Sequence, residues 1–283
     1  MNLKKIIKEF YEEKLLREGF DEIGQPDLKY YAFDWDDNIV QMPTQIILQD
    51  KDGNEVGMST EDFAEYREMI GEKPFEYKDR QIVGYAERPY RNFREEGNKQ
   101  FIIDSMLAKP GPSWSDFVEA INGGSIFAII TARGHNPETL REAVYNMIVT
   151  DHNGISKDEL LGNLKRYREY FDDTKMSDKE MIDFYLDLSK FHPVTYGEGN
   201  AANPEQGKIT ALKNFVSYVR GLAQELGEKA YFKNDVKNNF VPDIGFSDDD
   251  QKNIDAIKDF LKKEYDDKPV RTYLTKGGNK KEV

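Results

Sequence analysis

The stretch YYAFDWDDNIV, residues 30–40, joins a short apolar run to a group of carboxylates. Residues 30–33 have the continuous apolar character of a strand buried on both faces, as in a parallel sheet. Asp34, Asp36 and Asp37 follow at once. Ionised carboxylates this close repel one another unless a metal or a cationic side chain neutralises them. Since open α/β sheets bind ligands just beyond the carboxyl ends of their strands, the stretch predicts a site; the alternative is an acidic loop after an ordinary strand.

The composition is that of a globular protein, with 283 residues, 38% hydrophobic and 33% charged. The net charge of −13 argues against a broad surface for nucleic acid or for an anionic membrane. The absence of cysteine excludes disulfides and thiolate ligands and fits a reducing compartment. No apolar run approaches the ~20 residues of a membrane span, and the first residues lack the continuous apolar segment of a signal peptide. We therefore expect a cytoplasmic location.

Two further predicted strands end in polar groups. The apolar run SIFAII leads into Thr131 and Arg133, and a later strand leads into Asp248 and Asp249. Between them, a helix with Lys208 in its early turns is predicted to start after a capping asparagine. Right-handed crossovers bring the carboxyl ends of neighbouring parallel strands to one edge of a sheet. We therefore expect these groups to form one site with the first carboxylates.

Two stretches interrupt the alternation of strands and helices. Residues 41–112 combine a predicted β-hairpin, a helix and five prolines, and we interpret them as a first, mixed α/β insertion of the cap type. Residues 151–190 carry two capping boxes and predict a helical insertion. The expected core comprises residues 1–40, 113–150 and 191–283.

Three local patterns complete the prediction. Apolar positions at helical spacing over residues 3–18 predict an amphipathic helix that packs on the core or on a partner. Residues 50–61 match the oxygen-ligand spacing of a calcium loop, but Glu55 stands where that loop needs glycine, which favours a hairpin turn. Residues 270–275 predict a strand, and the tail after them is expected to be loose.

The ordered motifs resemble those of the haloacid dehalogenase superfamily of phosphotransferases. Asp34-Trp35-Asp36 matches its Asp-x-Asp after the first strand, and Thr131 matches the serine or threonine that ends the second. The lysine at a helix start is matched by Lys208, and the final acidic pair by Asp248 and Asp249. The phrases FDWDDNI and TARGHNP also look like those of family members encoded by large tailed bacteriophages.

The resemblance implies an α/β fold, a three-layer Rossmann-like parallel sheet with cap insertions. It also implies a catalytic set, in which Asp34 attacks phosphorus, Asp36 is the general acid and base, and Thr131 and Lys208 bind the phosphoryl group. Mg²⁺ is the implied cofactor. Its implied ligands are Asp34, Asp36 through the backbone region before it, Asp248 and Asp249.

Some assignments stay open. Arg133 is expected either to clamp the substrate phosphate or to pair with an acid of the cap. Thr131 and Lys208, taken singly, also fit a helix-entry residue and a solvated helix face, and Lys213 competes with Lys208. Asp37 and Asn38 stand where many family members have glycine and threonine, and no role for Asp37 follows from the pattern.

The leading functional hypothesis is a Mg²⁺-dependent phosphomonoester hydrolase acting on a small phosphorylated metabolite or a nucleotide. The alternatives are a polynucleotide 3′-phosphatase and a non-catalytic binding or assembly protein, virion-associated if the chain is phage-encoded. No membrane partner is expected. The segment 3–18 and the insertion at 41–112 are the candidate surfaces for a second copy or an assembly partner.

Overall fold

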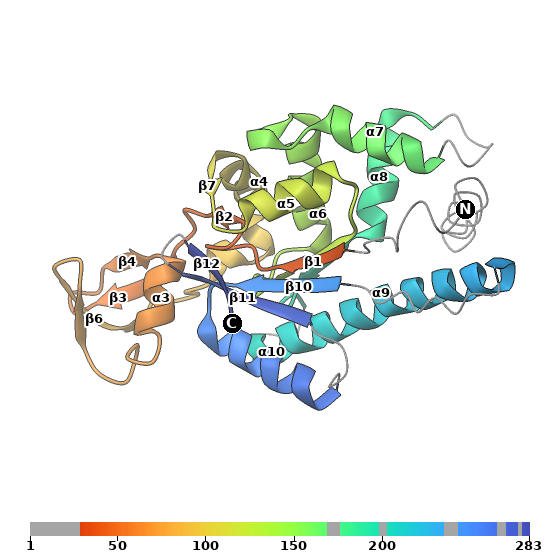
Figure 1. The fold of residues 1–283 in the computed structure, drawn as a ribbon. Helices are drawn as coiled ribbons and strands as arrows, with labels where there is room; N and C mark the ends of the chain where they lie inside the picture. Colours follow the sequence, from red (N-terminus) through yellow and green to blue (C-terminus); the bar gives the residue numbers. More distant parts are fainter. Residues whose placement is uncertain (1–28, 169–175, 198–202, 235–242, 265–269, 277–278) are drawn as a thin grey trace.

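The computed structural model describes residues 29–168, 176–197, 203–234, 243–264, 270–276 and 279–283. The helix predicted over residues 3–18 lies outside these ranges. A six-stranded sheet forms the centre of the molecule, in the order β12-β11-β10-β1-β8-β9 (Figure 1). Its strands are β1 (Lys29–Phe33), β8 (Phe127–Thr131), β9 (Lys190–Pro193), β10 (Asp243–Asp248), β11 (Val270–Lys276) and β12 (Asn279–Glu282).

Five neighbouring strands of this sheet, from β11 to β9, run parallel, which confirms the predicted mostly parallel sheet. The central strand β1 alternates its side chains between two separate cores, with Phe33 in one and Ala32 in the other. Burial on both faces explains its unbroken apolar sequence. The expectation of a loose tail was wrong, since β12 pairs antiparallel with the end of β11.

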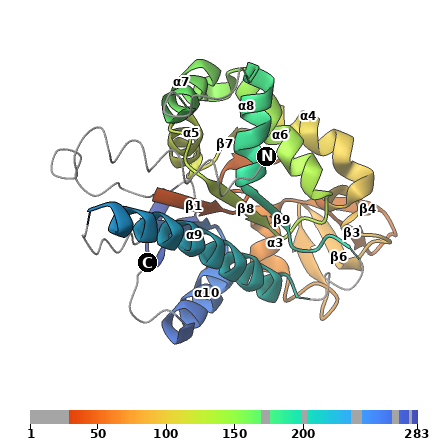
Figure 2. The same ribbon diagram turned by 90° about the vertical axis from the view of Figure 1, so that its right-hand side faces the viewer.

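Helices cover the sheet on both faces (Figures 1 and 2). The apolar residues of α5, α6, α7 and α8 lie in the same core cluster as Phe33 and Phe127, whereas those of α9 and α10 lie in the cluster with Ala32. The result is a three-layer α/β arrangement. Its helices are α5 (Trp114–Asn122), α6 (Pro137–Val149), α7 (Lys157–Arg168), α8 (Asp178–Leu188), α9 (Pro204–Asn234) and α10 (Gln251–Glu264).

The predicted helix starts are confirmed by their capping bonds. The side chain of Asn136 accepts a hydrogen bond from the backbone of Glu138 at the start of α6, and Ser177 and Glu180 form a capping box at the start of α8. At α9, Asn203 accepts from the backbone N–H of Gln206 at 3.0 Å. Such side chains satisfy N–H groups that have no partner within the helix. In the described part of the chain, no helix has the length and apolar content that crossing a membrane requires.

Residues 41–112 leave and rejoin the core through two short paired strands, β2 (Val40–Gln41) and β7 (Lys109–Pro110). Between them lies an antiparallel sheet in the order β4-β3-β6-β5, with its own apolar cluster. The predicted hairpin is confirmed, and the Asp50 carboxylate accepts from the backbone N–H of Asn54 within its turn. The elements are β3 (Ile46–Asp50), β4 (Glu55–Met58), α3 (Thr60–Tyr66), β5 (Phe75–Tyr77), β6 (Arg80–Tyr85) and α4 (Asn98–Leu107), with 3-10 turns at Arg91–Phe93 and Glu95–Gly97.

Candidate active site

The carboxyl ends of β1, β8 and β10 meet at one edge of the sheet, because β1 pairs with both of the other strands. In this register Phe33 lies opposite Ser247, so the residues that follow, Asp34 and Asp248, are level with each other. The backbone N–H of Asp34 continues the ladder by donating to the carbonyl oxygen of Ser247 at 2.9 Å. The parallel pairing thus brings together acids that are 214 positions apart in the chain.

An acidic cluster occupies this edge. Asp34, Asp248 and Asp249 each offer a carboxylate oxygen, and these atoms lie within 4.8 Å of one another. The side chains of Asp34 and Asp248 are almost wholly buried. Oδ1 of Asp34 is buried and has no hydrogen-bond partner among the described residues. A buried carboxylate oxygen without a donor is costly, so the cluster needs a positive charge.

Lys208 supplies part of that charge. It lies in the second turn of α9, and its Nζ is 2.6 Å from Oδ2 of Asp248 and 3.2 Å from Oδ2 of Asp34. The lysine is 3% exposed. Lys213, the competing candidate, is instead exposed on the same helix, with its Nζ 5.8 Å from the ring centre of Phe260. Of the two lysines, Lys208 is the one that the fold brings to the acids.

The electrostatics of the cluster follow from its burial. Burial raises the pKa of Asp34 to about 7, against the lowering effect of Lys208, and Asp248 adds to the rise. Burial also raises the pKa of Asp249 well above its usual range, with repulsion from Asp248 in the same direction. For Lys208, burial favours the neutral amine, but Asp248 and Asp34 outweigh it and hold its pKa above the usual range. The lysine therefore stays charged, and both Asp34 and Asp248 interact with its ammonium group.

The donor set fits a hard divalent cation. Three carboxylates from the ends of two adjacent strands provide oxygen ligands only, which Mg²⁺ and Ca²⁺ prefer. Oδ1 of Asp34, which accepts no hydrogen bond from the described residues, is an available ligand atom. Asp34, Asp248 and Asp249 are thus the residues that could hold a metal, and they are three of the four predicted ligands.

The fourth predicted ligand, Asp36, has a different partner. Its two carboxylate oxygens accept hydrogen bonds from Nε and Nη2 of Arg133, at 2.8 and 2.6 Å. Arg133 is 1% exposed, so the guanidinium is buried with the pair. The expected acid partner of Arg133 was one from the insertion, whereas the observed partner belongs to the loop after β1. Sequence patterns missed this pair because nothing local connects positions 36 and 133.

Thr131 ends β8 beside β1 and is 1% exposed. Its Oγ1 lies 3.4 Å from the backbone nitrogen of Arg133, which donates to it. The backbone carbonyl of Thr131 accepts from Val194, which fixes the end of the strand. The hydroxyl therefore lies at the end of β8, at the same sheet edge as the acids.

Asn38 is a site residue to which the sequence assigned no role. Its fully buried amide nitrogen lies 2.8 Å from the carbonyl oxygen of Ser247 and 3.2 Å from that of Asp34. It also donates to Oγ of Ser247 at 2.9 Å. Asn38 thus ties the loop after β1 to the end of β10. An uncharged, amide-bearing residue within an acidic loop was the available signal.

Asp37 connects the site to the insertion. Its backbone is left-handed, with φ of 52°, and its carboxylate accepts a hydrogen bond from the hydroxyl of Thr60, at the start of α3. Burial raises the pKa of Asp37 to about 6, against the effect of the Thr60 bond. At the other end of α3, Arg67 contacts Asp250 at 3.0 Å and Glu205 at 3.6 Å. The insertion is thereby seated on the loops that carry the acids.

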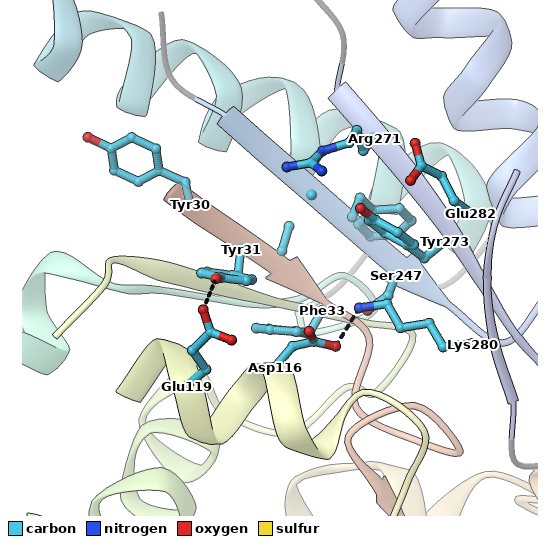
Figure 3. Close-up of a pocket in the computed structure, with 13 residues that line it drawn as sticks. Tyr30, Tyr31, Phe33, Asp116, Glu119, Ser247, Arg271, Tyr273, Lys280 and Glu282 are labelled. Carbon is cyan, nitrogen blue, oxygen red and sulfur yellow. Dashed lines mark hydrogen bonds and ion pairs between the residues drawn. The ribbon is translucent and has the colours of Figure 1, made fainter. Parts of the chain in front are cut away.

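A separate hollow of about 410 Å³ lies on the sheet face between α5 and β12 (Figure 3). Tyr31, Phe33 and Tyr273 line its floor, and Lys280 reaches across it to Oδ2 of Asp116 at 2.6 Å. Its lining includes Ser247 but none of the acids, lysine or threonine of the site described above. The hollow is therefore distinct from the strand-end site.

In comparisons with known proteins, no family model, no curated protein and no solved structure matches this chain.

Proposed function

We propose that the protein is a Mg²⁺-dependent phosphomonoester hydrolase of the haloacid dehalogenase type, with Asp34 as nucleophile and residues 41–112 as its cap. The observation that carries the proposal is the convergence of Asp34, Asp248, Asp249 and Lys208 at the carboxyl edge of a parallel sheet. The central position of β1, with the acids directly after it, agrees with ligand binding at this edge of an open α/β sheet.

The proposed reaction has two balanced steps. In the first, an oxygen of Asp34 forms a bond to phosphorus, the ester oxygen leaves, and the proton of Asp36 passes to that oxygen. In the second, water forms a bond to phosphorus and gives its proton to Asp36. The acyl-phosphate bond of Asp34 breaks, inorganic phosphate departs, and both carboxyl groups return to their first state.

The other residues neutralise charge. Lys208, held between Asp34 and Asp248, offers an ammonium beside the reacting carboxylate. Thr131 offers a hydroxyl at the same edge for a phosphoryl oxygen. When bound by Asp34, Asp248 and Asp249, Mg²⁺ supplies a Lewis acid for the charge of the phosphoryl group. The buried, unbonded Oδ1 of Asp34 supports this assignment.

A second hollow lies beside the insertion, and none of the acids, the lysine or the threonine of the strand-end site lines it. It has a volume of about 610 Å³ and lies between insertion residues 88–96 and the core at Gly134 and Thr195. Three arginines line it together with Glu95 and Glu96. Each arginine already has a partner: Arg88 pairs with Glu96, Arg91 pairs with Glu55, and Arg94 donates to Thr195. A small metabolite or a nucleotide monoester is the preferred substrate class because the net charge of −13 argues against a broad surface for a nucleic-acid substrate.

The test is hydrolysis of 4-nitrophenyl phosphate with and without Mg²⁺ by the wild type and by Asp34→Asn. We expect turnover that needs the metal and is lost in the variant. The matched control is Asp116→Asn, which changes a carboxylate of the separate hollow and should leave turnover intact.

One observation favours the non-catalytic alternative. Several strand-end residues already have partners within the protein, since Lys208 contacts two acids and Asp36 binds Arg133 through both of its oxygens. A binding or assembly protein could retain such a network for stability alone. That function would be favoured if the folded protein binds Mg²⁺ yet turns over none of a broad panel of phosphate esters, 3′-phosphorylated oligonucleotides included.

A further inference from the structure

The guanidinium of Arg133 is at the centre of a buried network. It binds both oxygens of Asp36, donates to Oγ1 of Thr44 at 2.8 Å and lies 3.1 Å from Nε2 of His135. These contacts engage four of its five N–H groups. A substrate phosphate would find little donor capacity left. The clamp role expected of Arg133 is therefore poorly supported by its surroundings.

Residues of the insertion enclose this network. The guanidinium carbon lies 4.7 Å from the ring centre of Phe93 and 4.9 Å from that of Phe101. On the far side, Nδ1 of His135 lies 3.0 Å from Oδ1 of Asn98. Thr44, Phe93, Asn98 and Phe101 all belong to residues 41–112. The insertion thus holds the arginine directly by two ring faces and one hydroxyl, and indirectly through Asn98, which contacts the core residue His135.

The protonation state of His135 matches its hydrogen-bond partners. Burial lowers the pKa of His135 to about 3, and the neighbouring Arg133 acts in the same direction. A neutral ring that donates from Nδ1 to Asn98 presents Nε2 as an acceptor to Arg133. Every polar contact of the guanidinium is therefore complementary, which fixes its plane and with it the plane of Asp36.

We propose that Arg133 is a positioning residue, through which the insertion sets the direction of the Asp36 carboxylate. The inference rests on the proposed function, in which Asp36 exchanges a proton with the ester oxygen and with water. A bidentate pair with arginine uses one acceptor site on each carboxylate oxygen and leaves a further site on each. The remaining acceptor sites of Asp36 can then face the reacting group, while Arg133 fixes the plane of the carboxylate.

A positioning role predicts a dependence of the rate loss on the leaving group, which a purely structural role of Arg133 does not predict. Proton donation matters most when the departing oxygen is strongly basic and matters little for a weakly basic one. Loss of the Asp36 geometry should therefore impair phenyl phosphate far more than 2,4-dinitrophenyl phosphate. The value of kcat/KM reports the steps up to departure of the alcohol, so it isolates the step that needs the proton.

The experiment measures kcat/KM for both esters, at saturating Mg²⁺, in the wild type, Arg133→Met, Arg133→Lys and Thr44→Val. General acid–base groups contribute ~10²- to 10⁴-fold, so we expect Arg133→Met to lose at least about tenfold more on phenyl phosphate than on the dinitrophenyl ester. Arg133→Lys keeps the charge but not the paired geometry, so it should rescue only part of the loss. Thr44→Val removes one bond to the guanidinium and should act in the same direction, more weakly.

Arg141→Met is the matched control. It also removes an arginine that pairs with two acids, Asp183 and Asp187, but these lie away from the site. It should leave the ratio of the two esters unchanged. Equal losses on both esters in Arg133→Met and Thr44→Val, or full rescue by Arg133→Lys, would overturn the positioning role while the hydrolase survives. If Arg133→Met does not fold, Thr44→Val and Arg133→Lys decide the question. A folded wild type that hydrolyses neither ester would overturn both the proposed function and the role of Arg133.

Discussion

The ammonium of Lys208 lies 2.6 Å from Oδ2 of Asp248, in a contact that joins the start of α9 to the end of β10. Both side chains are almost wholly buried, and Asp34 approaches the same ammonium at 3.2 Å. A buried lysine that contacts two acids offsets part of the free-energy cost of burying their carboxylates. Its removal would leave the carboxylates without a cation.

We predict that Lys208→Met destabilises the protein by about 3–5 kcal/mol at neutral pH without divalent metal, because a buried ion pair loses one partner. Urea unfolding measures the loss. Added Mg²⁺ should recover part of it, since the three remaining carboxylates gain a new cation. Lys213→Met, on the exposed side of the same helix, is the control and should change stability by no more than about 0.5 kcal/mol. Equal effects of the two substitutions would contradict the charge-neutralising role.

The pH dependence of stability should report on Asp34. Its pKa is raised to about 7 by burial, whereas an unfolded aspartate titrates near pH ~4. Between these values the folded state holds a proton that the unfolded state has lost, so stability falls as the pH rises from about 4 to 7.

Asp34→Asn cannot titrate, so its stability should fall less steeply over that range, and it should become the more stable protein at neutral pH without metal. Mg²⁺ favours the ionised acid and should raise the unfolding midpoint of the wild type at neutral pH more than that of the variant. Parallel stability curves for the two proteins between pH 4 and 7 would exclude the raised pKa.

Asn38→Ala tests the brace between β1 and β10, that is, the hydrogen bonds by which the Asn38 amide joins the two strand ends. The amide donates to the backbone oxygens of Asp34 and Ser247 in a fully buried position. Leaving buried acceptors without a donor costs about 1–3 kcal/mol, and we expect a loss of that size in urea unfolding. Asn214→Ala, at an exposed position of α9, should have almost no effect. A loss at position 38 no larger than that at 214 would show that the brace contributes nothing.

Local patterns predicted much of the fold. The run before Asp34 and the run before Thr131 are buried on both faces, so their apolar composition identified β1 and β8 directly. Capping side chains such as Asn136 and Ser177 act within one helical turn and identified where helices begin. The strand β12 was missed because its sequence, NKKE, is polar and pairs at the edge of the sheet, where little apolar burial is required.

The acids and lysine of the candidate site could be grouped from sequence because parallel topology brings strand ends together. The partner of Asp36 could not, since the pair with Arg133 depends on how the insertion packs its rings around the guanidinium. Asp37 likewise acquires its partner, Thr60, only once the insertion is seated. Long-range polar contacts of this kind have no periodicity or spacing that a sequence displays.

The central claim is that Asp34 is a nucleophile in metal-dependent phosphoryl transfer. The most direct measurement is the rate of 4-nitrophenol release from 4-nitrophenyl phosphate, with Mg²⁺ and after its removal by chelation, for the wild type and for folded Asp34→Asn. The account predicts turnover by the wild type that chelation abolishes and Mg²⁺ restores, together with none by the variant. The account would be contradicted if Asp34→Asn turned the ester over at the wild-type rate. It would also be contradicted if the wild type, folded and with Mg²⁺ bound, showed no turnover.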